Sequence, residues 1–137
     1  MKIASWNVNS LNVRLPHVEQ WCATAQPDLL GIQETKMEDA KFPRAAIEAL
    51  GYEVAFSGQK TYNGVALLSR TPATDVVKNI PGFEDDMARV IAGTVLPEGI
   101  SYGATGVRVI GAYFPNGQEP GSDKFEYKME WLKGLRQ

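Results

Sequence analysis

Residues 27–36, PDLLGIQETK, decide the fold of this chain. The apolar run Leu29–Ile32 is typical of a strand that is buried on both faces, and it ends abruptly in polar residues. Upstream, residues 2–8 (KIASWNV) are predicted to form another strand. Between the two, apolar residues recur at helical spacing from Pro16 to Ala25, before Pro27. The sequence therefore predicts a βαβ unit whose two strands are parallel.

The middle of the chain continues this α/β pattern and then turns to consecutive strands. Apolar residues at helical spacing predict a helix over residues 43–50, which Gly51 ends, and an alternating pattern predicts a strand over 52–57. Consecutive strands suggest antiparallel additions to the sheet. Four of them are predicted, over residues 64–69, 75–80, 89–95 and 107–114.

The last part of the chain is predicted to be a helix. Ser122 or Asp123 is expected to cap it, and its apolar face continues almost to Gln137. The glycine-rich residues 99–106 are expected to form a hairpin loop rather than a domain linker. Since no internal repeat is present, residues 1–137 are predicted to form one α/β unit.

Composition excludes several classes of protein. The chain has 137 residues, of which 44% are hydrophobic and 22% charged, as in an ordinary globular domain. No apolar stretch approaches the roughly 20 residues that cross a bilayer, and no signal peptide is recognisable, so a soluble cytoplasmic protein is expected. The single cysteine, Cys22, fits a reducing compartment and is expected to be a small buried hydrophobic residue. A net charge of -2 gives no global basic field, so any binding of phosphate must be local.

Asn7 and Glu34 lie at the carboxyl ends of the two strands of the predicted βαβ unit. The carboxyl ends of parallel strands face one crevice, where open α/β sheets bind ligands. A carboxylate and an amide oxygen suit Mg²⁺ or Mn²⁺, which commonly takes one or two protein carboxylates. The spacing therefore indicates part of a metal site, although on spacing alone both residues could simply be solvated turn residues.

The amino-acid sequences of five segments give further evidence for such a site. Residues 5–11 (SWNVNSL) and 27–36 resemble the two opening motifs of the exonuclease III family, which includes the major apurinic/apyrimidinic endonucleases. Three further segments are similar in order and spacing: residues 50–52 (LGY), 64–69 (GVALLS) and 111–117 (GAYFPNG). The resemblance implies a four-layer α/β/β/α sandwich of the deoxyribonuclease I-like type. It also implies a metal-dependent phosphodiesterase of base-excision repair, which cleaves DNA 5′ to abasic sites and trims 3′ ends as a 3′–5′ exonuclease and 3′ phosphatase.

The resemblance also assigns roles to three catalytic residues. Glu34 would be the carboxylate ligand of Mg²⁺ or Mn²⁺, and Asn7 would lie beside it and hold the metal shell or a catalytic carboxylate. Tyr113 would reach the scissile phosphate, where a phenol can donate a hydrogen bond to developing charge.

Several other polar residues are candidates for binding the phosphates of DNA. Lys36 directly follows Glu34-Thr35, and the family places a phosphate-binding lysine in this block. Each basic residue could equally be a solvated surface charge, and each asparagine a turn residue. The set comprises Asn9, Arg14, Lys36, Lys60, Asn63 and Arg89.

The same comparison indicates that the chain is half of a nuclease domain. The family has about twice this length and carries a glycine-aspartate-x-asparagine strand end and a late aspartate-histidine pair, neither of which occurs in residues 118–137. His17, on the first predicted helix, is expected to be a surface residue. We therefore expect an amino-terminal half that is inactive alone, lacks a general base and requires the carboxyl-terminal half.

Because each half is expected to supply much of one layer, an uncovered apolar sheet face should make the chain associate with itself. Two alternatives stay open. One is a natural short homologue that binds nucleic acid or regulates without catalysis, and the other is a different phosphoesterase of the wider superfamily.

Overall fold

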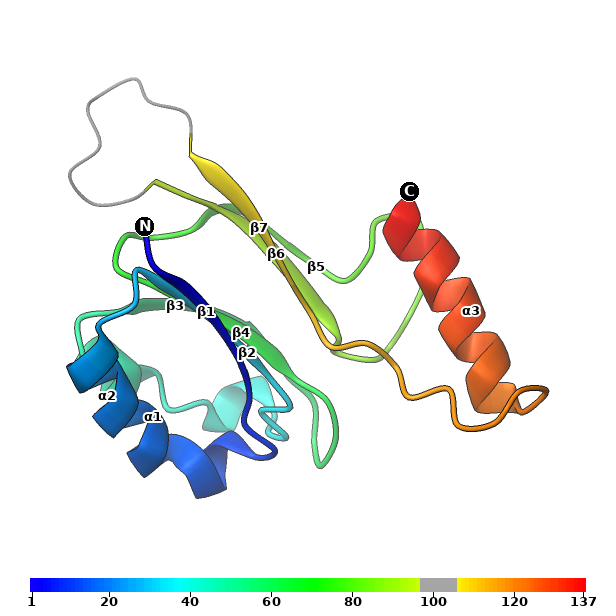
Figure 1. Ribbon diagram of the computed structural model, residues 1–137, viewed down its shortest axis with the longest axis horizontal. Coiled ribbons are helices and arrows are strands. Elements are labelled where there is room, and N and C mark those ends of the chain that lie inside the picture. Colours follow the sequence, from blue (N-terminus) through cyan, green and yellow to red (C-terminus); the bar gives the residue numbers. More distant parts are fainter. Residues whose placement is uncertain (97–105) are drawn as a thin grey trace.

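A computed structural model of the chain describes residues 1–96 and 106–137, which form two β-sheets and their covering helices (Figure 1). The predicted hairpin loop over 99–106 falls, except for Gly106, outside the described residues. The elements are β1 (Ile3–Asn7), α1 (Leu11–Ala25), β2 (Leu29–Gln33), a 3-10 turn (Asp39–Lys41), α2 (Arg44–Glu48), β3 (Glu53–Ser57), β4 (Val65–Ser69), β5 (Thr74–Lys78), β6 (Val90–Val95), β7 (Val107–Ala112) and α3 (Asp123–Arg136).

The first sheet has the strand order β1-β2-β4-β3. β1 and β2 pair in parallel, which confirms the βαβ unit, and β4 pairs antiparallel with both β2 and β3. α1 and α2 cover one face of this sheet (Figure 1). α1 begins five residues before the predicted start at Pro16 because the side chain of Ser10 caps it, accepting a hydrogen bond from the backbone N–H of Val13.

The second sheet contains β5, β6 and β7 in that order, all antiparallel. The prediction that the later strands all extend the first sheet is therefore wrong for these three strands. β4 is apolar on both faces, so one face packs on the helices while Val65 and Leu67 pack on Ile91 of β6. A second sheet over β4 buries that inner face, which an extension at the sheet edge would leave open to water.

α3 lies on the far side of the second sheet, which completes the order helix, sheet, sheet, helix (Figure 1). Ser122, one of the two residues that the sequence offered as caps, caps the start of this helix by accepting a hydrogen bond from Phe125 N. Trp131 is its one buried residue, and its ring packs edge-on against Phe114 with the ring centroids 5.0 Å apart. The predicted α/β/β/α architecture is confirmed.

One expectation about the layers is wrong. The chain contributes to all four layers, so it does not leave a complete sheet face uncovered as a half that formed a single layer would. The exposed apolar residues of the sheets instead include residues on outer strands, such as Ile3 of β1 at 55% exposed and Ile110 of β7 at 60%. Within residues 1–96 and 106–137, no helix combines the length and apolar character that crossing a membrane requires.

Candidate functional site

The βαβ unit places the residues after β1 against those after β2. Asn7 is the register partner of Gln33. Past the strands, Ser10 N donates to the carbonyl of Glu34 at 2.8 Å, and Leu11 N donates to the carbonyl of Thr35 at 3.0 Å. These backbone bonds fix the segment that carries Asn7 and Asn9 beside the segment that carries Glu34 and Lys36.

The same row of backbone bonds continues across both sheets. Lys36 N donates to the carbonyl of Asn63 at 2.8 Å, and Gly64 N donates to that of Ala88 at 2.8 Å. Tyr113 N then donates to the carbonyl of Arg89 at 2.8 Å. The structure therefore brings together five separate segments that hold seven of the predicted site residues: Asn7, Asn9, Glu34, Lys36, Asn63, Arg89 and Tyr113.

Several residues of these hydrogen-bonded segments have a left-handed backbone conformation. Asn9, Ser10, Glu34, Lys36 and Asn63 have φ values of 46°, 87°, 59°, 55° and 60°. Non-glycine residues adopt this region at a cost of about 1–3 kcal/mol each, and such strain clusters at functional sites. The surrounding hydrogen bonds hold these strained segments in place.

Glu34 and Tyr113 form the central side-chain contact of the site. The Tyr113 hydroxyl donates to Oε1 of Glu34 at 2.8 Å, although the two residues lie 79 positions apart. Burial raises the pKa of Tyr113 above its ordinary value, and the hydrogen bond to Glu34 and the charge of that carboxylate raise it further, while Arg89 lowers it. Tyr113 is therefore a neutral phenol, and a hydrogen-bond donor, at neutral pH.

Asn7, Asn9 and Lys36 form a second polar group on the βαβ side. Lys36 Nζ donates to Oδ1 of Asn9 at 2.6 Å, and the backbone N–H of Asn9 donates to Oδ1 of Asn7 at 3.1 Å. This chain of contacts keeps an ammonium group close to the ends of β1 and β2, as the interpretation of Lys36 as a phosphate ligand requires.

The donor set suits a hard divalent cation. Among the described residues, no side chain other than Tyr113 donates to the Glu34 carboxylate, so Oε2 has no protein donor. That part of the chain holds no group of three or more His, Cys, Asp or Glu side chains placed to share a metal. The residues present therefore fit an ion that takes one carboxylate and an amide oxygen from the protein, as Mg²⁺ does when substrate and water complete its shell.

Asn63 is buried, and its side chain is engaged inside the protein. Its Nδ2 donates to Oε1 of Gln59 at 3.0 Å and to Sδ of Met87 at 3.4 Å. The adjoining Gly64 has φ +98°, and a Cβ at that position would collide with Oγ1 of Thr35. In this structure the Asn63-Gly64 pair thus forms a tight turn against the Glu34 segment.

Arg89 stands between two aromatic rings. Its guanidinium carbon lies 5.0 Å from the ring centroid of Tyr113 and 5.6 Å from that of Tyr127. It lines a groove of about 680 Å³ beside the site. The other residues that line this groove are Gln59, Tyr62, Asn63, Met87, Tyr113, Pro115, Asn116, Gln118, Asp123, Lys124 and Tyr127.

Sequence reasoning missed several polar residues of this groove, among them Asn116, Gln59, Lys124 and Tyr127. Asn116 belongs to the segment 111–117, and its place three residues after Tyr113 was the available signal. Gln59 accepts hydrogen bonds from both Asn63 Nδ2 and Ala88 N, yet nothing in the sequence marks it. Lys124 and Tyr127 reach the groove from α3, whose amphipathic pattern predicted the helix but not its position.

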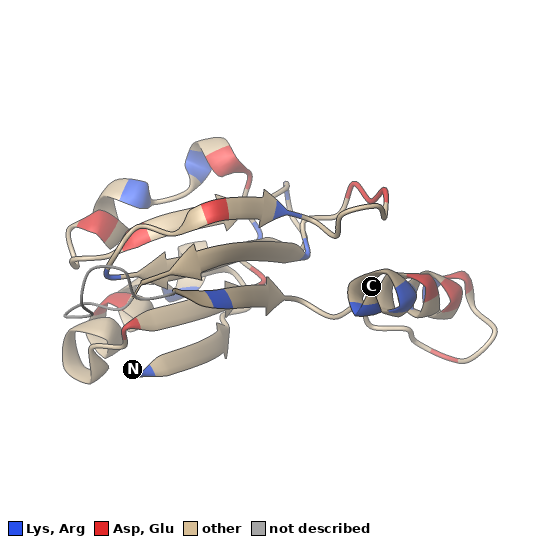
Figure 2. Ribbon diagram, turned by 90° about the horizontal axis from the view of Figure 1, so that it is seen from above, with Lys and Arg blue, Asp and Glu red and all other residues tan. Residues whose placement is uncertain are grey.

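Lysine side chains gather at one further cavity. A space of about 450 Å³ is lined by Lys36, Lys41 and Lys60, together with Asn12, Met37, Glu38 and Thr61. It adjoins the predicted site through Lys36. Elsewhere, acidic and basic residues are interspersed along the helices and strands (Figure 2), consistent with local rather than global attraction of phosphate.

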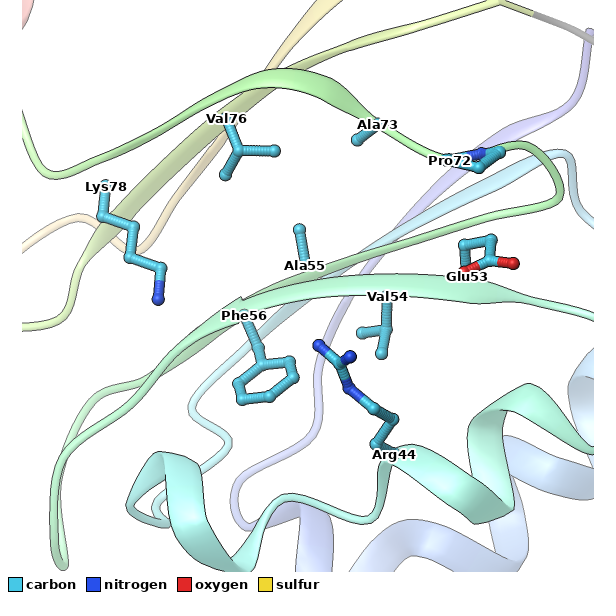
Figure 3. Close-up of a pocket in the computed structure, with 9 residues that line it drawn as sticks. All are labelled: Arg44, Glu53, Val54, Ala55, Phe56, Pro72, Ala73, Val76 and Lys78. Atoms are coloured by element: carbon cyan, nitrogen blue, oxygen red, sulfur yellow. The ribbon is translucent and has the colours of Figure 1, made fainter.

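Another cavity, of about 340 Å³, lies between β3 and β5 (Figure 3). Its two basic residues are already engaged: Arg44 pairs with Glu48 and lies over Phe56, and Lys78 pairs with Asp39. None of the predicted site residues lines it. His17 is exposed on α1 and Cys22 is buried, as the sequence predicted.

Two stacked sheets between helices, with a carboxylate, an amide and a phenol gathered at the strand ends, define an α/β/β/α sandwich of the deoxyribonuclease I type. The chain belongs to the endonuclease/exonuclease/phosphatase family, whose sequence profile matches residues 4–132.

Named relatives and solved structures show which members of this family the chain is similar to. The chain is 35% identical to exodeoxyribonuclease III of Haemophilus influenzae, over 100% of this chain and 50% of that protein. Its structure is similar to that of the 3′ phosphatase NExo from Neisseria bound to a product DNA hairpin, with 47% identity, a TM-score of 0.89, and coverage of 98% of this chain and 49% of that one. It is also similar to an AP endonuclease from Archaeoglobus fulgidus, with 40% identity, a TM-score of 0.87, and coverage of 98% and 49%. The chain thus spans about half the length of the curated relatives it matches.

Proposed function

We propose that residues 1–137 are the amino-terminal half of an exonuclease III-like DNA repair nuclease that hydrolyses phosphodiester bonds with Mg²⁺ or Mn²⁺. The proposed reactions are cleavage 5′ to abasic sites and removal of nucleotides or phosphate from 3′ ends. The observation that carries the proposal is the 2.8 Å hydrogen bond from Tyr113 to Glu34, made between the two sheets at the strand ends. The names of relatives similar over nearly the whole chain support it. A cytoplasmic location is part of the proposal, consistent with the single buried Cys22.

Each site residue has a proposed role. Glu34 would hold the metal through its carboxylate, and Asn7 would supply an amide oxygen beside it. When bound, the metal would neutralise charge on the phosphate and on the departing 3′ oxygen.

The remaining groups act on the phosphate directly. Tyr113 is a neutral phenol and would donate a hydrogen bond to a phosphate oxygen on which charge develops. Lys36 and Arg89 would bind the phosphates of the DNA strand as cations, with Asn9 holding the ammonium of Lys36 in place. Asn63 would donate to phosphate only after releasing Gln59 and Met87. The residue that activates the attacking water would come from the carboxyl-terminal half.

Metal binding by the 137-residue chain tests the first step. We expect Mn²⁺ to bind the wild-type chain and binding to weaken at least about tenfold in Glu34→Gln, because one charged ligand is replaced by an amide. Glu53→Gln, an exposed carboxylate on β3, is the matched control and should bind Mn²⁺ as the wild type does. Equal binding by Glu34→Gln and the wild type, measured by electron paramagnetic resonance, would contradict the metal assignment.

Complementation tests the catalytic step. A duplex with one abasic site is incubated with Mg²⁺ and the chain, either alone or with the separately produced carboxyl-terminal half of the Neisseria relative. We expect nicking only in the mixture and its loss with Glu34→Gln. Nicking by the chain alone would show that it is not an inactive half. No nicking in a mixture that does form a complex would favour the non-catalytic binding homologue.

A further inference from the structure

Arg89 is held by residues from two elements that are distant in sequence. It directly precedes β6, while Tyr113 follows β7 and Tyr127 lies on α3. Both rings stand within cation–π range of its guanidinium, at 5.0 and 5.6 Å. We call these three residues the Arg89 clamp.

The outer ring of the clamp is itself fixed. The Tyr127 hydroxyl donates to Oδ2 of Asp85 at 2.6 Å. Asp85 is tied to the same loop, because its Oδ1 accepts from the backbone N–H of Met87 at 3.0 Å and its carbonyl accepts from Nδ2 of Asn79 at 3.2 Å. Tyr127 therefore joins α3 to the loop that leads into Arg89.

Few hydrogen bonds hold the Arg89 head group. Nη1 makes a long bond of 3.4 Å to the carbonyl of Tyr113. Nε is buried and has no hydrogen-bond partner among the described residues. A buried donor without a partner is unfavourable. The two tyrosine rings, at 5.0 and 5.6 Å from the guanidinium carbon, are therefore the side chains best placed to set the orientation of this guanidinium.

From these contacts we infer that Tyr127 is a positioning residue of the site, which presses Arg89 against Tyr113 and so presents the guanidinium to a DNA phosphate beside the Tyr113–Glu34 pair. α3 then has a function beyond covering the second sheet. The identity of the ligand rests on the proposed function, whereas the clamp rests on the contacts alone.

The alternative is that Tyr127 only attaches α3 to the sheet. Trp131 provides the matched control, since it lies one turn further along α3 and packs on Phe114 without contacting Arg89. Trp131→Phe is expected to weaken the attachment of α3 while it leaves the three clamp residues unchanged. Tyr127→Leu removes one ring of the clamp, while Tyr127→Phe keeps the ring and loses only the bond to Asp85.

The clamp itself is tested by NMR of the 137-residue chain. Two aromatic faces should shift the Nε–Hε resonance of Arg89 away from its position in an unfolded peptide. We expect Tyr127→Leu to remove much of this shift and Tyr127→Phe to restore it, with Trp131→Phe close to the wild type. An Arg89 resonance that is unchanged in Tyr127→Leu would overturn the inference, whatever the chain binds.

Affinity for a short DNA duplex, measured by fluorescence anisotropy, tests the consequence. Tyr127→Leu is expected to weaken binding about fivefold, the size of a partly desolvated cation–π contact. In an Arg89→Ala background, the same change should have no further effect, because Tyr127 acts through Arg89.

A loss that is equally large in both backgrounds, or that Trp131→Phe reproduces, would show a structural role only. If the wild-type chain binds no DNA while the NMR result holds, the proposed function fails as regards binding by this chain and the clamp stands.

Discussion

The two sheets of this protein differ in the number of their strands that are largely buried: two in the first sheet and one in the second. All five residues of β4 in the first sheet are buried, and so are four of the five residues of β2. In the second sheet only the middle strand β6 is largely buried, with four of its six residues, whereas all five residues of β5 are exposed and α3 has only Trp131 buried. The first sheet has a core of its own beneath α1 and α2, whereas the second depends mainly on its contact with the first.

This difference matters because the site draws on both regions. Glu34 and Lys36 come from the well-buried sheet, and Arg89 and Tyr113 come from the other. The pairing of Tyr113 with Glu34 therefore reports how well the two sheets pack on each other. Stability should reside in the first sheet, and alignment of the site should be sensitive to the second.

The largest expected loss of stability comes from a substitution in the core of the first sheet. Leu68→Ala removes a fully buried side chain and should lower the free energy of unfolding by about 3 kcal/mol. Ile110→Ala in the second sheet, where the side chain is 60% exposed, should change it by less than about 0.5 kcal/mol. Urea denaturation of the two variants checks this, and similar losses would break the distinction between the sheets.

A smaller loss of stability is expected at the Asn63-Gly64 turn, whose backbone bonds to Ala88 on the side of the second sheet. Gly64→Ala places a Cβ against Oγ1 of Thr35 at a left-handed φ and should cost about 2 kcal/mol or more while displacing the Glu34 segment. Gly51→Ala is the control, because Gly51 has φ +91° and open space around it. Gly51→Ala therefore tests the backbone strain alone, and urea denaturation of both variants gives the difference due to the collision. Equal losses would mean that the contact with Thr35 is easily relieved.

The smallest effect concerns pH and the attachment of α3. Burial, followed by the hydrogen bond to Asp85, raises the pKa of Tyr127 from about 10 to about 12. Because the folded pKa is the higher one, this stabilisation is complete below about pH 10 and is lost as pH rises through about 12. The melting temperature, followed over this range, should fall less steeply in Tyr127→Phe than in the wild type. Identical profiles would show that Tyr127 does not titrate with unfolding.

Much of the fold could be predicted from local patterns. The segment 2–8, the helical pattern up to Ala25 and the apolar run Leu29–Ile32 predicted β1, α1 and β2, and Ser122 was one of two residues predicted to cap α3. The ends of helices were predicted less well. The sequence pattern placed the start of α1 at Pro16, whereas the helix starts at Leu11, because Ser10 caps it, and Pro16 lies inside it. Hydrophobic periodicity identifies elements well, and it says little about where a capping side chain ends them.

By itself, the sequence determined which residues are candidates for the chemistry, because Asn7 and Glu34 lie at the carboxyl ends of strands and the QETK and YFPNG segments resemble motifs of a known family. Only the tertiary structure decided that β5–β7 form a second sheet and that Tyr113 meets Glu34 across 79 positions. The stacking of Arg89 between Tyr113 and Tyr127 was decided in the same way. The physical reason is that periodicity and motifs record a residue's own backbone and burial, whereas contacts between distant residues depend on how whole faces pack.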